Sequence, residues 1–376
     1  MNRPLRAAEF FAGIGLMRGG LEAAGIETIW ANDIEPRKRE LYVANFGERE
    51  FILADVRDLK GASVPNVDLA TASFPCTDLS LAGNRRGLGD SAAPHGLEGG
   101  SSMFWEFARV LEEMGTRRPQ IVLLENVLGF QSSRGGKDIL DTIRELNRLG
   151  YSCDLLSVDA RHFVPQSRPR MFIVGLSDPP RAWVADVSQR PAWVQRFART
   201  PPGIRMHTAP LPPLPESTTT LRDIVERFDS GSPEWWEADR VDLFVRSLST
   251  LQAARLNTLR RARTLKWRTA YRRTRNGVAV WEIRADELAG CLRTARGGSS
   301  RQALVEAGRG GLRIRWLMPR EYARLMGAEN FTIVGGRNQA LFGFGDAVCV
   351  PVISWLARHS VLAVGETRDR SSMLAA

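Results

Sequence analysis

The chain has 376 residues, enough for about two domains that each bury a core, or for one large α/β unit with an insertion. Its 52 Lys and Arg against 42 Asp and Glu give a formal charge of +10, which suits a polyanion such as nucleic acid better than an acidic small molecule, although many soluble proteins are basic for solubility alone. No two of the four cysteines form a Cys-x-x-Cys pair, so we expect neither a metal site nor a disulfide framework.

The N-terminal stretch MNRPLRAAEFF has no continuous apolar segment and reaches an acid at Glu9. No uncharged apolar run approaches the roughly 18 residues that span a membrane. These features predict a soluble, cytoplasmic protein with no membrane partner. Association with the nucleoid is expected only because DNA is the expected partner.

From residue 5 to about residue 177, short apolar runs alternate with helical patterns. The runs are LRAAEFF, ETIWAND, FILAD, VDLATASF, QIVLLENV and MFIVGL, and the helical patterns are LMRGGLEAA, EPRKRELYVANF, MFWEFARVLEEM and KDILDTIRELNRL. This alternation predicts an α/β fold with a mostly parallel sheet and helices on both faces. Ligands of such sheets bind beyond the carboxyl ends of the strands.

The first three predicted strands each deliver an acid to this edge, namely Glu9, Asp33 and Asp55. Gly13 and Gly15 follow the first strand and allow a ligand to approach the backbone closely. The dinucleotide fingerprint is not satisfied, because the next glycine comes one position late. The series indicates an adenosine-type ligand, and a glycine turn that serves only helix packing is the alternative.

The fourth strand delivers Pro75 and Cys76. Free cysteine is usually a small buried hydrophobe, but polar residues follow this one and the proline fixes the backbone that aims the sulfur. Arg85 and Arg86 follow closely, and a nearby arginine would raise the thiolate fraction. The Gly- and Ser-rich residues 81–102 predict a lid or binding loop, with a surface insertion as the alternative.

Glu125 ends the strand QIVLLENV, where partial desolvation would favour its protonated form; a structural pair with an arginine is the alternative. Arg168 and Arg170 occupy alternate positions and therefore point to one face of a strand. A thiolate, a neutral acid, an arginine pair and an adenosine-type ligand together suit the alkylation of an unreactive ring carbon. Carbon 5 of cytosine is such a carbon until a thiolate adds to carbon 6.

The remainder of the chain carries no βαβ rhythm. Nine of the 20 prolines lie between Asp178 and Ser217, which excludes regular helix there, and the residues that follow predict a smaller irregular domain. MPREYARLMG predicts an amphipathic helix capped by Gly327, and AVCVPVISWLARHS predicts a strand or helix that returns to the first domain. The expected domains cover residues 1–177, 178–334 and, as a returning segment, 335–376.

The chain resembles the DNA cytosine-5 methyltransferases. FAGIGLMRGG, ANDIEP, FPCTDLS, ENV, QSRPR and the stretch from REYARLMG to FGFGDAV occur in that family's order, and the resemblance covers the chain outside about residues 178–285. It implies a Rossmann-like S-adenosylmethionine-binding domain and a small target-recognition domain. S-adenosylmethionine would be the cofactor, S-adenosylhomocysteine its product, and double-stranded DNA the substrate.

The resemblance also implies roles for particular residues. Cys76 would be the nucleophile, Glu125 the acid at ring nitrogen 3, and Arg168, with Arg170, a support for the activated base. Phe11 would stack on the cofactor, with Asp33 at its ribose and Asp55 at its adenine. The other implied cofactor contacts are Gly13, Gly15, Ile34, Val56, Pro75, Asp346 and Val348.

The expected DNA contacts lie in four places along the chain. Residues 255–275 hold nine basic residues and no acid, a run suited to phosphates, although a solvated helix face is the alternative. GGSSR is expected to meet backbone phosphates. The predicted DNA contacts are Arg268 and Arg272 in the basic run, Ser299 and Arg301 in GGSSR, Arg85 and Arg86 in the loop, and Gln166.

Two departures from the family pattern occur: Asp346 replaces an asparagine, and Thr77 replaces the glutamine after the cysteine. Three Thr-Leu pairs, at 250–251, 258–259 and 264–265, fit the recognition domain equally well. Transfer RNA as substrate, a catalytically weak DNA-binding relative and a nicotinamide-dependent dehydrogenase remain alternatives. The base that removes the carbon 5 proton is unassigned. We expect a monomer whose restriction endonuclease, if one is genetically linked, does not bind it.

Overall fold

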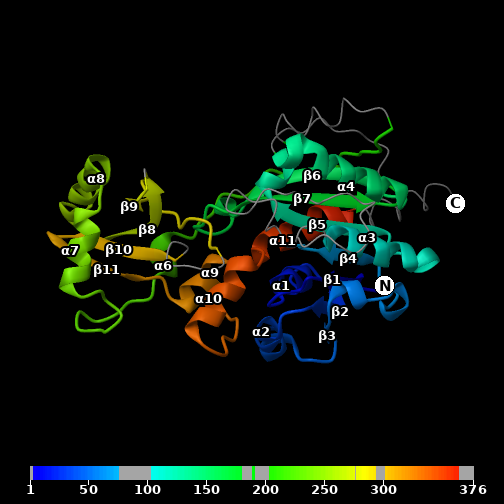
Figure 1. The fold of residues 1–376 in the computed structure, drawn as a ribbon, viewed down its shortest axis with the longest axis horizontal. Helices are drawn as coiled ribbons and strands as arrows, with labels where there is room; N and C mark the ends of the chain where they lie inside the picture. Colours follow the sequence, from blue (N-terminus) through cyan, green and yellow to red (C-terminus); the bar gives the residue numbers. More distant parts are fainter. Residues whose placement is uncertain are drawn as a thin grey trace. The chain divides into compact units, whose positions relative to one another are not determined.

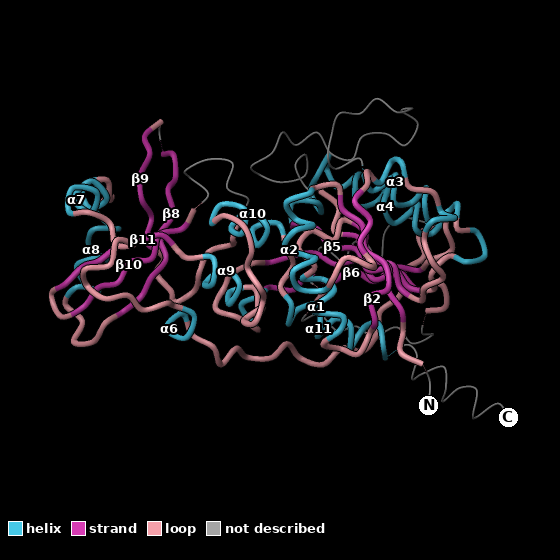
Figure 2. Tube along the Cα trace, turned by 90° about the horizontal axis from the view of Figure 1, so that it is seen from below, coloured by secondary structure: helices cyan, strands magenta, loops and turns pink. Residues whose placement is uncertain are grey.

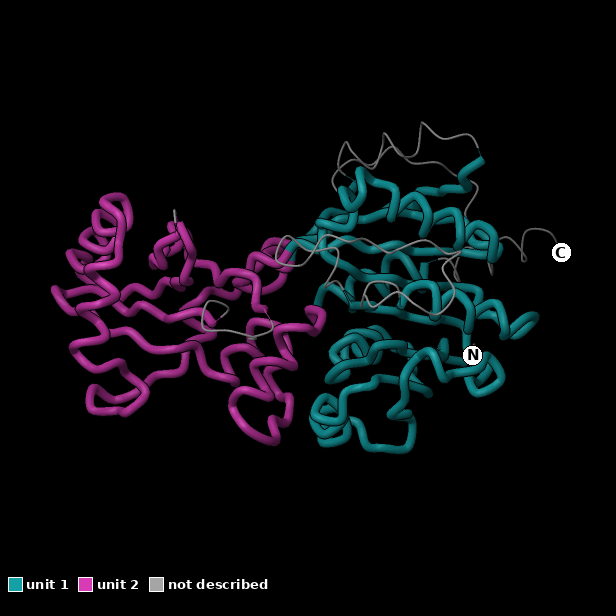
Figure 3. Tube along the Cα trace, viewed as in Figure 1, with its two compact units in different colours: residues 1–159, 169–214, 350–376 teal, residues 160–168, 215–349 magenta. Residues whose placement is uncertain are grey.

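The computed structural model describes residues 3–75, 103–179, 189–190, 203–275, 277–293 and 301–363. The chain divides into two compact units, which Figure 3 colours separately. Unit 1 comprises Met1–Asp159, Pro169–Leu214 and Val350–Ala376, and unit 2 comprises Ala160–Arg168 and Pro215–Cys349.

Unit 1 is built on a seven-stranded sheet with the strand order β3-β2-β1-β4-β5-β7-β6 (Figure 1). Its strands are β1 (Arg6–Phe10), β2 (Glu27–Asp33), β3 (Phe51–Leu53), β4 (Leu69–Ala72), β5 (Ile121–Val127), β6 (Ser152–Asp159) and β7 (Pro169–Leu176). The strands from β3 to β5 are parallel, and β7 runs antiparallel to both of its neighbours. The predicted α/β class with a mostly parallel sheet is confirmed.

The helices of unit 1 cover both faces of this sheet. They are α1 (Leu16–Glu22), α2 (Pro36–Phe46), α3 (Met103–Glu113), α4 (Lys137–Arg148) and α11 (Val350–Leu356), with single-turn segments at Val56–Asp58, Gly61–Ser63 and Gly115–Arg117, an irregular one at Leu128–Gly136, and a π-helical turn at Ala357–Leu362. Figure 2 shows α3 and α4 on one side of the sheet and α1 and α11 on the other.

Aromatic packing anchors α3 to the sheet. The ring of Phe10 on β1 lies 4.8 Å from that of Trp30 on β2 and 5.0 Å from that of Phe107 on α3. On the opposite face α1 approaches α11 closely, since a Cβ at Gly20 would lie 2.5 Å from the Cβ of Ile353. The closing segment predicted as strand or helix is therefore a helix of unit 1.

The unit boundaries differ from the expected domain boundaries at residues 177 and 334. Residues up to 214 belong to unit 1, because the backbone N–H of Arg205 donates to Asn147 and Arg190 pairs with the buried Asp154. Residues up to 349 belong to unit 2, where the rings of Phe331 and Phe344 lie 5.4 Å apart.

Unit 2 contains a four-stranded antiparallel sheet with the order β11-β10-β8-β9. Its strands are β8 (Lys266–Arg275), β9 (Val278–Ile283), β10 (Gln302–Gly308) and β11 (Gly311–Trp316). Its helices are α6 (Leu221–Ile224), α7 (Ala238–Arg246), α8 (Thr250–Arg260), α9 (Pro319–Leu325) and α10 (Arg337–Asp346), with a single turn at Ala160–His162. Buried side chains of α7 and α8, including Phe244 and Leu256, pack on this sheet against Trp281.

The helix predicted over MPREYARLMG is α9, and Gly327 follows it with a φ of 71°. By length and composition the helical stretch Arg337–Leu362 could cross a membrane, but 72% of its most apolar window is buried inside the protein. Burial of this extent is typical of a core helix.

Unit 2 also contains a fully buried ion pair. Arg315 Nη1 donates to Glu321 Oε2 at 2.8 Å, and neither side chain is exposed. We expect Glu321→Gln to lower the free energy of unfolding by about 3–5 kcal/mol, because it leaves a buried guanidinium without a counter-charge. Urea denaturation measures this loss. The matched control is Glu329→Gln, since Glu329 pairs with Arg324 at the surface and should contribute no more than about 1 kcal/mol. Equal losses in the two variants would contradict the prediction.

Candidate active site

The glycine turn after β1 is tied to the end of β2. The backbone N–H of Gly13 donates to Asp33 Oδ2 at 2.8 Å, and Oδ1 of the same carboxylate accepts from the N–H of Glu35 at 2.9 Å. Gly13 has a φ of 58° and Gly15 a φ of 86°, which suit glycine. Phe11 has a φ of 57°, which is costly for an aromatic residue. Backbone strain of this kind often marks a ligand site.

The predicted cofactor residues beside this turn offer both apolar and acidic groups. Ile34 is 61% exposed although it directly follows the buried Asp33, and Val56 is buried. Asp55 accepts a hydrogen bond from the backbone N–H of Arg57 at 2.9 Å, and hydrogen bonds from the Arg57 side chain lower the pKa of its carboxyl group. An apolar surface beside two carboxyl groups fits the base and hydroxyl groups of an adenosine.

The sequence placed Glu9 at the ligand edge as the acid of the first strand but gave it no role in the site. It is 1% exposed on β1, and neither carboxylate oxygen has a hydrogen-bond partner among the residues that the structure describes. Burial raises the pKa of Glu9 to about 8, and the charge of Arg18 partly opposes this. An acid inside the otherwise apolar run AAEFF was the available signal, but sequence alone did not show which way its side chain points.

The raised pKa makes stability depend on pH. The folded protein keeps the Glu9 proton at pH values where the unfolded chain, with a pKa near 4.5, has lost it. The stability present below about pH 4.5 is therefore lost as the pH rises toward about 8. We expect Tm to fall between about pH 6 and pH 8 in the native protein and to fall less in Glu9→Gln. Glu22→Gln is the control, and an equal change in both variants would contradict the assignment.

Glu125 and Arg170 meet in unit 1, where β5 pairs with β7. Arg170 Nε lies 3.0 Å from Glu125 Oε1, and Glu125 is 7% exposed. The neighbouring Asn126 donates through its side chain to the carbonyl of Phe74 at 3.2 Å, which ties β5 to the end of β4. Pro75, the last described residue of that segment, is exposed. Cys76, Arg85, Arg86 and the predicted lid at 81–102 lie outside the described residues.

Arg168 belongs to unit 2, whereas Arg170 belongs to unit 1. It is 2% exposed, and its guanidinium donates to the carbonyl of Leu292 at 2.9 Å, to that of Gly345 at 3.2 Å and to that of Ala347. The two arginines therefore do not share one face of a strand as predicted, because only Arg170 belongs to strand β7. Arg168 holds the backbone on either side of Asp346.

Gln166 is fully buried in unit 2. Its side-chain amide donates to the carbonyl of Leu325 at 2.7 Å and accepts from the N–H of Leu292 at 3.1 Å. These contacts occupy the amide inside the unit, so the structure gives no surface at which it could meet DNA, and we do not retain Gln166 as a DNA contact.

The other predicted residues of unit 2 lie in different surroundings. Asp346 is exposed at the end of α10, whereas Val348 is buried. Arg268 pairs with Glu287 at 3.0 Å, which compensates its charge. Arg272 is exposed, and Arg301 lies 6.0 Å from the ring centre of Trp316. Ser299 lies outside the described residues.

Arg240 was missed by the sequence reasoning. Its guanidinium lies 4.1 Å from the ring centre of Trp236 and 5.0 Å from that of Trp316. Burial and the charge of Arg301 lower its pKa. Arg240 and Arg301 lie beside the same Trp316 ring, an arrangement that suits a phosphate. They are 61 positions apart along the chain, so no local sequence pattern links them.

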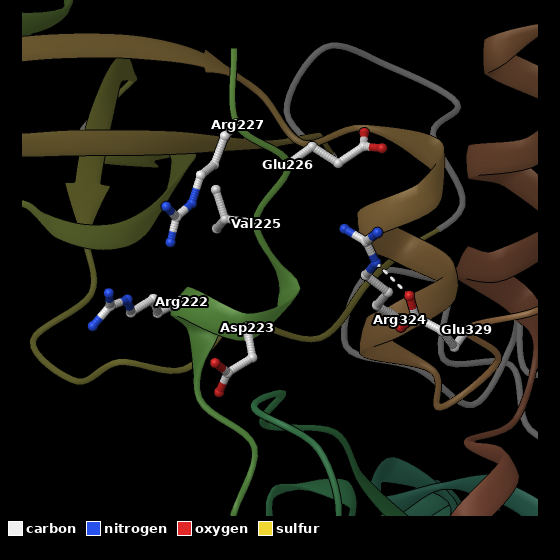
Figure 4. Close-up of a pocket in the computed structure, with 7 residues that line it drawn as sticks. All are labelled: Arg222, Asp223, Val225, Glu226, Arg227, Arg324 and Glu329. Carbon is white, nitrogen blue, oxygen red and sulfur yellow. Dashed lines mark hydrogen bonds and ion pairs between the residues drawn. The ribbon is translucent and has the colours of Figure 1, made fainter.

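A pocket of about 520 Å³ lies in unit 2, and Figure 4 shows it. Its lining is made of three arginines, three acids and one valine, namely Arg222, Asp223, Val225, Glu226, Arg227, Arg324 and Glu329. Arg324 Nε donates to Glu329 Oε1 at 3.0 Å. None of the predicted site residues lines this pocket.

Among the described residues no group of three or more His, Cys, Asp and Glu could hold a metal ion. The cysteines in the described part of the chain, Cys153, Cys291 and Cys349, are free thiols. The fourth, Cys76, lies outside it.

Unit 1 has the fold of the S-adenosylmethionine-dependent methyltransferases. The chain belongs to the C-5 cytosine-specific DNA methylase family, whose model matches residues 5–361. Enzymes of this family use S-adenosylmethionine. The family assignment disfavours the dehydrogenase alternative.

Two curated relatives illustrate the similarity in sequence. The chain is 33% identical over 174 residues to the type II methyltransferase M.Bsp6I of Bacillus sp. (strain RFL6), which covers 46% of this chain and 52% of that protein. It is 30% identical over 171 residues to the type II methyltransferase M.HhaI of Haemophilus parahaemolyticus, covering 45% and 48%. The chain thus spans about half the length of the curated relatives that it matches.

Solved structures extend the likeness over nearly the whole chain. The S. pombe Dnmt2 methyltransferase aligns with a TM-score of 0.60 and 18% identity, covering 96% of this chain and 99% of that one. The Entamoeba histolytica methyltransferase EhMeth aligns with a TM-score of 0.63 and 14% identity, with the same coverage. At these identities the likeness is one of fold.

Proposed function

We propose that this protein transfers a methyl group from S-adenosylmethionine to carbon 5 of a cytosine in double-stranded DNA, at a specific short sequence. The observation that carries the proposal is the family match over residues 5–361, supported by type II methyltransferases among the relatives. The basic charge of +10 suits the polyanionic substrate.

The proposed chemistry begins with a cytosine that has swung out of the duplex, since carbon 6 cannot be reached inside it. Cys76 Sγ adds to carbon 6 while Glu125 gives a proton to nitrogen 3, which makes carbon 5 an enamine carbon. When bound, S-adenosylmethionine supplies the methyl group from its sulfonium. A base then takes the carbon 5 proton, the Cys76 sulfur leaves as a thiolate, and nitrogen 3 returns its proton to Glu125, which restores the aromatic ring.

Arg170 is the positioning residue in this scheme, because its 3.0 Å contact with Oε1 holds the carboxyl group of Glu125 in place. Arg168 supports the base through the segment around Asp346, whose carbonyls it binds. Residues 81–102 would close over the flipped base.

The cofactor would be held mainly at the ends of β1 to β3. Phe11 and Ile34 offer apolar surface to the adenine, Asp33 accepts from the ribose hydroxyls, and Asp55 accepts from the adenine amine. Gly13 has open space beside it, since a Cβ there would meet no atom within 4 Å. Gly15, Val56, Pro75, Asp346 and Val348 complete the proposed set.

We also propose that DNA contacts come from Arg272, Arg301 and Ser299 in unit 2 and from Arg85 and Arg86 in the loop. The enzyme would act as a monomer in the cytoplasm on nucleoid DNA. A genetically linked restriction endonuclease would recognise the same site without binding the methyltransferase. Gel filtration at micromolar concentration tests the monomer, and a doubled mass would contradict it.

The function is tested with tritiated S-adenosylmethionine and two polymers, duplex DNA of random sequence and transfer RNA. We expect label in the DNA at carbon 5 of cytosine and none in the RNA. Label in transfer RNA alone would replace the proposal by the RNA alternative. Binding of DNA without label in either polymer would favour the catalytically weak relative.

A further inference from the structure

In the described part of unit 2, the hairpin of β8 and β9 extends beyond the rest of the sheet. Strand β10 pairs with β8 only as far as Tyr271, opposite Gln302, whereas β8 and β9 continue to pair as far as Arg275 and Val278. Figures 1 and 2 both show this end of the hairpin projecting past the neighbouring strands. Among the residues that the structure describes, 272–275 and 278–281 therefore pair only with each other, and they form a two-stranded ribbon, called the β8–β9 ribbon below.

On one face of the β8–β9 ribbon, the two arginine side chains interact with other side chains of the same face. The guanidinium of Arg273 stacks over the ring of Tyr271 at 4.6 Å. Arg275 Nε donates to Glu282 Oε1 at 2.8 Å. Because side chains alternate along a strand, these four residues share a face through the register that pairs Tyr271 with Glu282.

The opposite face carries Arg272, Thr274 and Ala279. Thr274 lies directly opposite Ala279, and Arg272 lies opposite Trp281, whose buried ring anchors the base of the ribbon. Arg272, Thr274 and Ala279 are all exposed. Neither Arg272 nor Thr274 has a side-chain hydrogen bond or ion pair among the described residues. This face thus presents an uncompensated guanidinium, a hydroxyl and a methyl group to solvent.

These three groups match the chemistry of base edges in DNA. Arginine binds O6 and N7 of guanine with two hydrogen bonds, and threonine and alanine contact the thymine methyl group. Two strands about 4.8 Å apart form a ribbon narrow enough for the major groove, which is about 12 Å wide. We propose that the β8–β9 ribbon enters the major groove with this face toward the bases, so that Arg272 selects a guanine next to or near the target cytosine. The inference rests on the proposed function, since it assumes a duplex DNA substrate.

Arg273 provides a matched control, because it is the adjacent residue, equally charged and exposed, on the other face. The experiment methylates a library of duplexes with randomised sequence, using the full chain and its Arg272→Ala, Arg272→Lys and Arg273→Ala variants. Bisulfite sequencing then reads the bases around each methylated cytosine. Thermal melting verifies that each variant is folded.

We expect Arg272→Ala to reduce the preference for guanine at one position by about 10- to 100-fold. Arg272→Lys should also lose preference, because an ammonium cannot make the paired hydrogen bonds. Arg273→Ala should retain the native sequence preference. An Arg272→Ala variant that methylates duplexes with the full native preference for guanine at every position would overturn the inference and leave the proposed function standing. Relaxation in Arg273→Ala alone would overturn the assigned face, and native enzyme that methylates only RNA would overturn both proposals.

Discussion

Duplex DNA containing 5-fluorocytosine is expected to trap the native protein in an adduct that survives denaturant, and Cys76→Ala is expected to form none. The physical reason is that the proposed reaction ends when carbon 5 loses a proton, and fluorine cannot leave in that way. Without the thiol, methylation should fall by at least about three orders of magnitude, because no other group makes carbon 5 nucleophilic. Denaturing gel electrophoresis with labelled DNA measures the adduct, and transfer of tritium measures the methylation.

Cys291 supplies the control for this experiment. It is half-buried, and its Sγ lies 3.4 Å from Arg168 Nη1, a residue proposed to support the base. By contrast, burial raises the pKa of Cys153, which disfavours its thiolate. We expect Cys291→Ala to trap normally. If Cys76→Ala still formed the adduct and Cys291→Ala did not, the nucleophile would be Cys291.

The parallel part of the fold could be predicted because its signals are local. Apolar runs such as QIVLLENV and helical patterns such as KDILDTIRELNRL became β5 and α4 close to their expected bounds. Strand β6 was missed, since Ser152 and Asp154 make its sequence look polar. Asp154 is nevertheless buried, because Arg190, 36 positions away, pairs with it. An ion pair between residues so far apart in the sequence leaves no periodic pattern in it.

The candidate site likewise combines features that local sequence predicts with features that depend on tertiary packing. The carboxyl ends of parallel strands meet at one edge, so Asp33 was expected beside the glycine turn, and it accepts a hydrogen bond from Gly13. The burial of Glu9, the positive φ of Phe11 and the split of Arg168 from Arg170 depend on tertiary packing. The same holds for Gln166, whose partner Leu325 lies 159 positions away.

Replacing Glu125 with glutamine is expected to lower the methylation rate by about 10²- to 10⁴-fold, the usual range for losing a general acid. The amide keeps the size of the carboxyl group. It has no acidic proton to transfer to nitrogen 3, so it cannot balance the charge of that step. DNA with tritium at carbon 5 of cytosine gives the measurement, since each methylation releases that tritium to water. Affinities for the cofactor and for DNA should stay within a few-fold of the native values.

The ion pair between Glu125 and Arg170 offers a second explanation for such a loss, because the variant also leaves the 15%-exposed Arg170 side chain without its counter-charge. The two explanations differ in what Arg170→Gln does. If Glu125 acts on the base and Arg170 only positions it, Arg170→Gln should keep a substantial part of the activity, and the double variant should be as slow as Glu125→Gln alone. A Glu125→Gln variant with near-native turnover, or an Arg170→Gln variant as slow as Glu125→Gln, would show that the carboxyl group serves structure rather than proton transfer.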